Sequence, residues 1–189
     1  MQAQTFNIII SGVGGQGVIT LLSLIDTAAF IEGYNVKSSE LHGLSQRGGS
    51  VEVHVRFGKK VDSPLIPFGS ADLIMSLEML EGLRELARAG KNTKFLVNEY
   101  CLPFQGSLTK EEIKAHFKQI GDRLHLIAAF DICKEKLQNE VVSTIYLLGY
   151  AVHKKLIPLK KESVIKAIES TVPEKYRELN IKAFQLAYD

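Results

Sequence analysis

Apolar and polar positions at the start of the chain follow the pattern of a strand, a helix and a second strand. Residues 6–11 form a short β-branched run that stops at glycines, as a strand buried on both faces does. From Val18 onwards, apolar residues recur at three- and four-residue spacing until Gly33, which predicts a helix packed on a sheet. Residues 36–39 are extended again. We therefore expect a βαβ unit with parallel strands and a right-handed crossover.

Residues 50–57 alternate strictly between apolar and polar side chains. One side carries the apolar set Val51, Val53, Val55 and Phe57, and the other carries the polar set Ser50, Glu52, His54 and Arg56. Because successive side chains of a strand point to opposite faces, this segment is predicted to be a strand with one buried and one polar face.

The rest of the chain alternates strands with helices and then becomes helical. Further buried strands are predicted at residues 72–76, 94–98 and 124–130, and helices at 78–89 and 109–120. After Asp131 we expect helices at 140–156, 161–171 and 174–188, separated by Pro158 and Pro173. Without a repeat or linker, residues 1–189 are predicted to form one α/β domain of three layers. Its sheet should be mostly parallel, with one polar-faced alternating strand and a helical C-terminal layer.

Composition and charge exclude several classes of protein. Hydrophobic residues make up 46% and charged residues 23% of the chain, which argues against disorder. A net charge of +2 provides no overall field for nucleic acid or an anionic membrane. No Lys or Arg precedes Lys37, so the chain start lacks the cationic flank of a secretory signal, and we expect a cytoplasmic protein. The apolar stretches are too short or too interrupted to span a bilayer.

Two cysteines limit the metal chemistry of the chain. Cys101 and Cys133 form no CxxC pair and cannot supply the four thiolates of an iron–sulfur cluster or a structural zinc site. We interpret them as ordinary reduced thiols and expect no metal on this chain.

A glycine-rich loop joins the first strand to the first helix. Gly12-Val13-Gly14-Gly15-Gln16-Gly17 holds four of the fifteen glycines and satisfies GxGxxG. Such a loop lets backbone N–H groups approach an anion at the positive end of the following helix. Glu40 follows at the spacing of a ribose-binding acid, so an NAD(P)-binding protein is one hypothesis. Alternatively, the glycines only permit a tight turn and close packing.

A second loop, residues 40–50, follows the second strand. Both loops begin at carboxyl ends of predicted parallel strands, where α/β sheets bind ligands and partners, so they should converge. This would bring Gln16, His42, Gln46 and Arg47 together. Arg47, beside two glycines, could present a planar cation to a carboxylate or phosphate, or form an ordinary surface ion pair. A stand-alone module that binds coenzyme A or a nucleotide is therefore a further hypothesis.

Taken together, the two loops resemble the γ-type subunit or domain of 2-oxoacid:ferredoxin oxidoreductases. Residues 42–49, followed by 63–66 and 69–72, are most similar to the small β subunit of the indolepyruvate branch. The resemblance covers nearly the whole chain. In the late helix, Thr144 stands where the family often has Asn.

The resemblance implies a subunit without cofactors of its own. The family oxidatively decarboxylates 2-oxo acids, here an arylpyruvate, with coenzyme A as acyl acceptor and ferredoxin as electron acceptor. Thiamine diphosphate, Mg and the Fe–S clusters belong to the large α subunit, so this chain should be inactive alone. The expected binding residues, for coenzyme A or for the partner, are Gly12, Gly14, Gly15, Gln16, Gly17, Gln46 and Arg47, and no catalytic residue is assigned.

Overall fold

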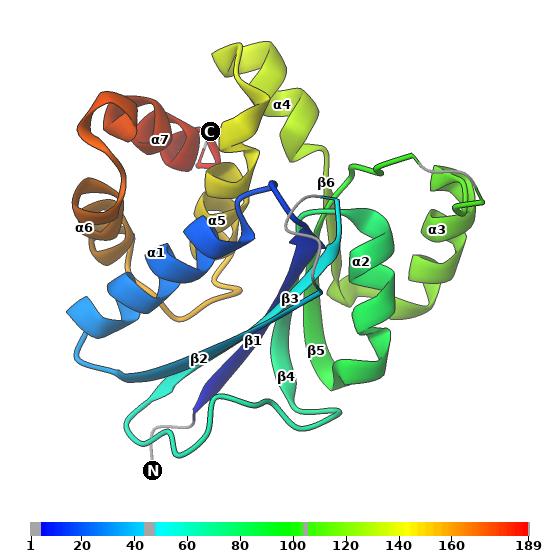
Figure 1. Ribbon diagram of the computed structural model, residues 1–189, viewed down its shortest axis with the longest axis horizontal. Coiled ribbons are helices and arrows are strands. Elements are labelled where there is room, and N and C mark those ends of the chain that lie inside the picture. The colour runs from blue at the N-terminus through cyan, green and yellow to red at the C-terminus, as the bar shows by residue number, and fades with distance from the viewer. Residues whose placement is uncertain (1–4, 44–47, 104–105, 189) are drawn as a thin grey trace.

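The computed structural model describes residues 5–43, 48–103 and 106–188, and contains a six-stranded sheet in the order β2-β3-β1-β4-β5-β6 (Figure 1). The strands are β1 (Phe6–Val13), β2 (Asn35–His42), β3 (Ser50–Gly58), β4 (Ala71–Ser76), β5 (Ala89–Asn98) and β6 (Leu124–Ile127). The α-helices are α1 (Val18–Ile31), α2 (Met79–Arg84), α3 (Lys110–Phe117), α4 (Ala129–Leu137), α5 (Ser143–His153), α6 (Lys161–Thr171) and α7 (Glu174–Leu186). Three 3-10 segments accompany them, η1 (Glu85–Arg88), η2 (Lys118–Arg123) and η3 (Glu140–Val142).

Strand directions refine the predicted βαβ unit. β1, β4, β5 and β6 are parallel neighbours, whereas β3 is antiparallel to both β1 and β2. β1 and β2 therefore run in the same direction, as expected, but β3 lies between them. The chain returns from β2 directly into β3 as its antiparallel neighbour, which places β2 at the edge of the sheet.

Helices cover both faces of the sheet, which confirms the three-layer α/β prediction. Figure 1 shows α1, α5, α6 and α7 on one side of the sheet and α2 and α3 on the other. The first side contains the larger apolar core, in which the predicted apolar side of β3 meets α1. The second side contains a smaller core around Ile9, Ile74 and Phe95. Within the described residues, no helix is long and apolar enough to cross a bilayer.

The polar side of β3 is covered, not solvated, by the segment that links β3 to β4. His54 is only 1% exposed, and its Nδ1 accepts a hydrogen bond from the Ile66 N–H at 2.9 Å. The other ring nitrogen, Nε2, therefore carries the proton and donates to Glu52 Oε1 at 2.6 Å. Arg56 donates to the Ser63 carbonyl of the same segment at 2.9 Å. The alternation thus marks two different packing surfaces.

Several predicted boundaries were wrong. The strand expected at 124–130 ends at Ile127, because Asn98 Oδ1 accepts the Phe130 N–H at 3.3 Å where α4 has begun. The helix expected at 78–89 gives way to η1 at Glu85, and β5 begins at Ala89 instead of residue 94. The early part of β5 fits because Gly90 lies against the Gly69 carbonyl, where an added Cβ would be 2.2 Å from the oxygen.

Candidate functional site

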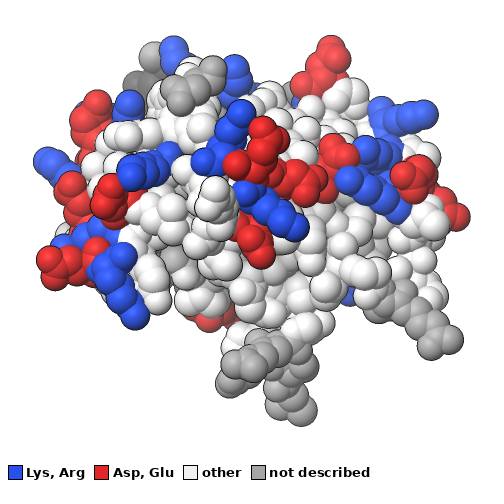
Figure 2. Space-filling view, turned by 90° about the horizontal axis from the view of Figure 1, so that it is seen from above, with Lys and Arg blue, Asp and Glu red and all other residues white. Residues whose placement is uncertain are grey.

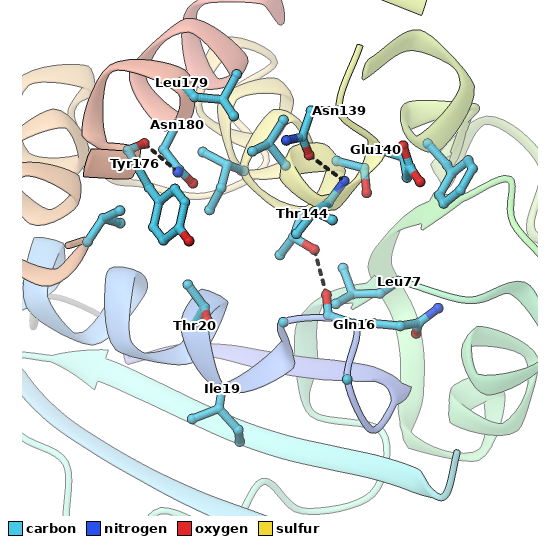
Figure 3. Close-up of a pocket in the computed structure, with 18 of the residues that line it drawn as sticks. Gln16, Ile19, Thr20, Leu77, Asn139, Glu140, Thr144, Tyr176, Leu179 and Asn180 are labelled. Atoms are coloured by element: carbon cyan, nitrogen blue, oxygen red, sulfur yellow. Dashed lines mark hydrogen bonds between the residues drawn. The ribbon is translucent and has the colours of Figure 1, made fainter. Parts of the chain in front are cut away.

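A pocket of about 870 Å³ opens at the carboxyl edge of the parallel strands (Figure 3). It lies between the glycine loop, the residues that follow β4 and β5, and the helices α5 and α7. Its lining includes Leu77 and Asn98 from the sheet side, and Thr144 and Tyr176 from the helices. The pocket therefore occupies the crevice where α/β sheets commonly bind ligands.

The glycines of the loop serve both the turn and close packing. Gly15 and Gly17 have φ values of 101° and 85°, a left-handed region that favours glycine. At Gly12, an added Cβ would lie 3.0 Å from both Gln16 Oε1 and Val18 Cγ2. A side chain at Gly12 would thus separate β1 from the start of α1.

The loop uses several of its own polar groups internally. The Val13 N–H donates to Gln16 Oε1 at 2.8 Å, and the Gly14 N–H donates to the Gly49 carbonyl at 2.8 Å. The Gln16 N–H bonds back to the Val13 carbonyl at 3.1 Å. Among the described residues, no acceptor is found for the N–H groups of Gly15 and Gly17. An anion at this loop would therefore meet a smaller set of donors than the motif suggests.

Thr144 ties the loop to the helical layer. Its hydroxyl donates to the Gln16 carbonyl at 2.9 Å, across 128 residues of sequence (Figure 3). Gln16 is therefore held through its side-chain oxygen inside the loop and through its carbonyl at the start of α5. Protein contacts therefore fix the loop on two sides.

Asn98 and an aromatic pair organise the sheet side of the pocket. Asn98 is 3% exposed, and its Nδ2 donates to the Leu77 carbonyl at 3.3 Å while its Oδ1 accepts from α4. Tyr100 and Phe130 stack with ring centroids 4.9 Å apart. Sequence reasoning missed Asn98, Thr144, Tyr176 and Asn180. Asn98, at the carboxyl end of a predicted strand, and Thr144, as a family departure, carried a signal.

The electrostatics of the pocket disfavour a strongly anionic ligand bound by this lining alone. Within the described lining, Glu140 is the one charged side chain, and neither Lys nor Arg is present. Several apolar side chains that line the pocket are exposed: Ile19 is 44%, Val141 79% and Tyr176 48% exposed. A polyphosphate would need cations from outside this set.

The structure separates the residues predicted for the site. Gly15, Gln16 and Gly17 line the pocket, whereas Gly12 is buried in β1 and Gly14 pairs with residues 48–49. Gln46 and Arg47 lie outside the described residues. The two loops do converge, because the Gly48 N–H donates to the Gly14 carbonyl at 3.3 Å.

Two other candidates lie away from the pocket. His42 and Glu40 sit on the exposed edge strand β2, and the His42 ring bonds the carbonyl of its neighbour Gly43 at 3.0 Å. Because β3 separates β2 from the glycine loop, Glu40 does not take the place of a ribose-binding acid. The NAD(P) hypothesis therefore lacks the ribose-binding acid that it requires.

Cys101 and Cys133 are free cysteines in the structure, in agreement with their interpretation as ordinary reduced thiols. Burial raises the pKa of Cys133 to about 11, and it also raises the pKa of Cys101. Cys101 contacts the Met79 sulfur at 3.5 Å. Within the described residues, no group of three or more His, Cys, Asp or Glu side chains could hold a metal ion.

Comparisons with known proteins define the family. Residues 7–189 match the model described as pyruvate ferredoxin/flavodoxin oxidoreductase. Indolepyruvate oxidoreductase subunit IorB of Archaeoglobus fulgidus is 36% identical, over 97% of this chain and 94% of that protein. The keto/oxoacid ferredoxin oxidoreductase γ subunit of Geobacter sulfurreducens aligns with a TM-score of 0.71 and 25% identity, covering 97% and 96% of the two chains.

A longer protein contains the same fold. The alignment with 2-oxoglutarate:ferredoxin oxidoreductase of Magnetococcus marinus, solved with 2-oxoglutarate, coenzyme A and succinyl-CoA bound, has a TM-score of 0.74 and 17% identity. It covers 97% of this chain but 30% of that chain. The present chain belongs to the pyruvate ferredoxin/flavodoxin oxidoreductase family, as the motifs predicted. The NAD(P)-binding alternative is not favoured.

Proposed function

We propose that this chain is the small subunit of a 2-oxoacid:ferredoxin oxidoreductase of the indolepyruvate type, and that its carboxyl edge faces a larger subunit. The name of the Archaeoglobus relative supports the branch. An arylpyruvate is the proposed substrate, with coenzyme A as acyl acceptor and ferredoxin as electron acceptor. The complex would work in the cytoplasm.

The distribution of exposed apolar side chains carries this proposal. Among the described residues, ten large apolar side chains have more than a third of their surface exposed. Phe30, Ile31, Leu65 and Phe68 lie away from the carboxyl edge, and six lie at it, namely Ile19, Leu41, Leu102, Leu108, Val141 and Tyr176. Viewed from that side, charged side chains gather along the top and left of the picture, and few are seen in the lower middle outside the residues drawn in grey (Figure 2). Apolar exposure with depleted charge is typical of a protein interface.

The pocket is suited to support chemistry that other groups perform. Thiamine diphosphate with Mg on the larger subunit would stabilise the carbanion left by decarboxylation, and its Fe–S clusters would carry the electrons. The residues of this chain would cover the reacting centre and exclude water. The N–H groups of Gly15 and Gly17 offer donors to an acyl acceptor, while cations for its phosphates would come from Arg47 or the partner.

Co-purification with a larger subunit tests the proposal. A tagged chain, purified without oxygen from its source cells, should retain a subunit that carries thiamine diphosphate and iron. The complex should reduce a viologen dye with arylpyruvate and coenzyme A, and the larger subunit alone should not. A larger subunit that is fully active alone, or no co-purifying subunit, would contradict the proposal.

Two matched variants locate the interface. Val141→Glu places a charge on the pocket rim, and Leu65→Glu places one on a side chain that is 54% exposed at the opposite edge. We expect Val141→Glu to weaken assembly by about tenfold or more, because a buried unpaired charge at an interface is costly. Leu65→Glu should assemble normally. Equal effects of the two variants would contradict the proposed orientation.

A further inference from the structure

We propose that Ser50 and Glu81 are positioning residues that set the glycine loop through residues 48–49. Ser50 begins β3, directly after the two glycines that pair with the loop, and Glu81 lies in the first turn of α2. Neither residue lines the pocket. The inference rests on the proposed function only in its kinetic test.

Ser50 bonds α2, and the two residues before it bond the glycine loop. Ser50 Oγ donates to Glu81 Oε2 at 2.5 Å. The residue before Ser50, Gly49, accepts the Gly14 N–H at 2.8 Å, and the Gly48 N–H donates to the Gly14 carbonyl at 3.3 Å. The backbone of Ser50 pairs with Val13 of β1, and its side chain adds a bond to α2 directly beside the two glycines that contact the glycine loop. A hydrogen bond to a carboxylate is stronger than one between neutral groups.

Glu81 is itself held firmly. Its side chain is 8% exposed, and its N–H donates to Glu78 Oε2 at 2.8 Å, which caps α2. The next residue, Gly82, lets α2 approach β4 closely, since an added Cβ would lie 2.9 Å from Ser76 Cβ. A carboxylate on a helix held this close can reach Ser50 across the end of β1. The opposite side of the loop is fixed separately by Thr144.

Hydrogen exchange of the isolated chain tests the inference directly. Ser50→Ala should raise amide exchange in residues 12–18 by about tenfold, the effect of losing roughly 1.4 kcal/mol of local stability. The melting temperature should hardly change. Ser50→Thr keeps the hydroxyl and should restore slow exchange. The control is Ser38→Ala, which removes a hydroxyl bonded to Asp26 at 2.7 Å on β2, away from the loop.

Two variants of Glu81, the acceptor of the Ser50 bond, test the same interaction. Glu81→Gln keeps a side-chain oxygen for Ser50 and should retain most of the protection, whereas Glu81→Leu should match Ser50→Ala. In the double variant Ser50→Ala with Glu81→Leu, the increases should not multiply, because both substitutions remove one interaction. Multiplying effects, or an exchange pattern for Ser50→Ala equal to that of Ser38→Ala, would overturn the inference.

The assembled enzyme supplies a second readout. Ser50→Ala should raise the KM for coenzyme A by about fivefold, leave the KM for the 2-oxo acid unchanged, and be rescued by Ser50→Thr. An inactive wild-type complex would count against the proposed function, while the exchange data would still decide the inference. Unaltered KM values in an active Ser50→Ala complex, despite faster loop exchange, would overturn the positioning role.

Discussion

The site is stabilised by different kinds of interaction on the two faces of the sheet. On the α1 and α5 side, the site rests on the larger apolar core, where Leu21, Ile25 and Leu148 are fully buried. On the α2 side, a smaller apolar core is accompanied by buried carboxyl groups, since Glu78 is 2% and Glu81 6% exposed. The first face depends on burial of apolar surface, which pH hardly changes. The second depends in addition on charges and hydrogen bonds, which pH does change.

Glu85 marks the difference most clearly. It is 6% exposed on η1, and burial, followed by the nearby charge of Glu52, raises its pKa to about 7. Arg88 acts in the opposite direction but does not cancel the shift. The α2 face thus contains a carboxyl group with a pKa near neutrality. On the α1 face, burial also raises the pKa of Asp26, which lies on α1.

The largest expected effect is on the apolar face. Leu21→Ala removes a fully buried side chain of α1 and should lower the free energy of unfolding by about 2 to 5 kcal/mol. The loss should be the same at acidic and neutral pH. Urea unfolding measures it, with Ile31→Ala, 42% exposed at the end of the same helix, as the control. A loss of stability that changes with pH would contradict the proposed difference between the two faces.

The next effect tests the acidic face. The folded pKa of Glu85, about 7, lies above the ordinary 4.5, so the folded protein binds the proton more tightly. Its stability contribution is present below about pH 4.5 and is lost as pH rises through 7. Glu85→Gln removes this loss and should raise stability at about pH 8 by about 1 to 2 kcal/mol, a figure discounted for solvent access.

Unfolding across the pH range checks this prediction. Relative to wild type, the stability of Glu85→Gln should increase between acidic and mildly alkaline pH. A constant difference, or a loss at alkaline pH, would show that Glu85 does not titrate as the structure implies. NMR titration of the Glu85 carboxyl carbon would locate the pKa independently.

A smaller effect is expected at the second anchor of the loop. Thr144→Val removes the hydroxyl bonded to the Gln16 carbonyl and should cost about 1 kcal/mol of stability. Exchange should rise at residues 15–18 more than at residues 48–50. Thr144→Ser, which keeps the hydroxyl, is the control. Equal exchange in both variants would mean that the loop does not depend on this bond.

The smallest effect is expected at a partly exposed ion cluster. Glu99 accepts bonds from Lys114 at 2.6 Å and Lys110 at 2.9 Å, and these bonds lower its pKa. Glu99→Gln should nevertheless cost no more than about 1 kcal/mol at neutral pH, because solvent screens such pairs. The cost should shrink with added salt in urea unfolding. A loss comparable to that of Leu21→Ala would contradict the ranking of the two faces.

Much of the fold could be predicted because local patterns and tertiary packing agree there. The β-branched run of β1 and the alternating valines of β3 occupy the strands expected for them. The glycine spacing also correctly predicted the loop between β1 and α1 and its place at the carboxyl edge of the sheet. In these regions each residue type is suited to one environment only.

The far wall of the site could not be predicted, because it forms through distant contacts. Thr144 bonds the glycine loop, and Asn180 lines the same pocket, only after α5 packs on α1 and α7 packs on α5. Glu81 falls on an expected helix, but its bond to Ser50 depends on how closely Gly82 lets that helix approach. The antiparallel place of β3 between β1 and β2 has no local signal either.

The central claim is that the carboxyl edge of this chain is covered by a larger subunit. Hydrogen exchange of the isolated chain and of the purified complex tests it in one comparison. We predict protection in the complex at residues 15–20, 139–144 and 174–180, with no change across residues 58–70 at the opposite edge. Protection at residues 58–70, without protection around the pocket, would contradict the account.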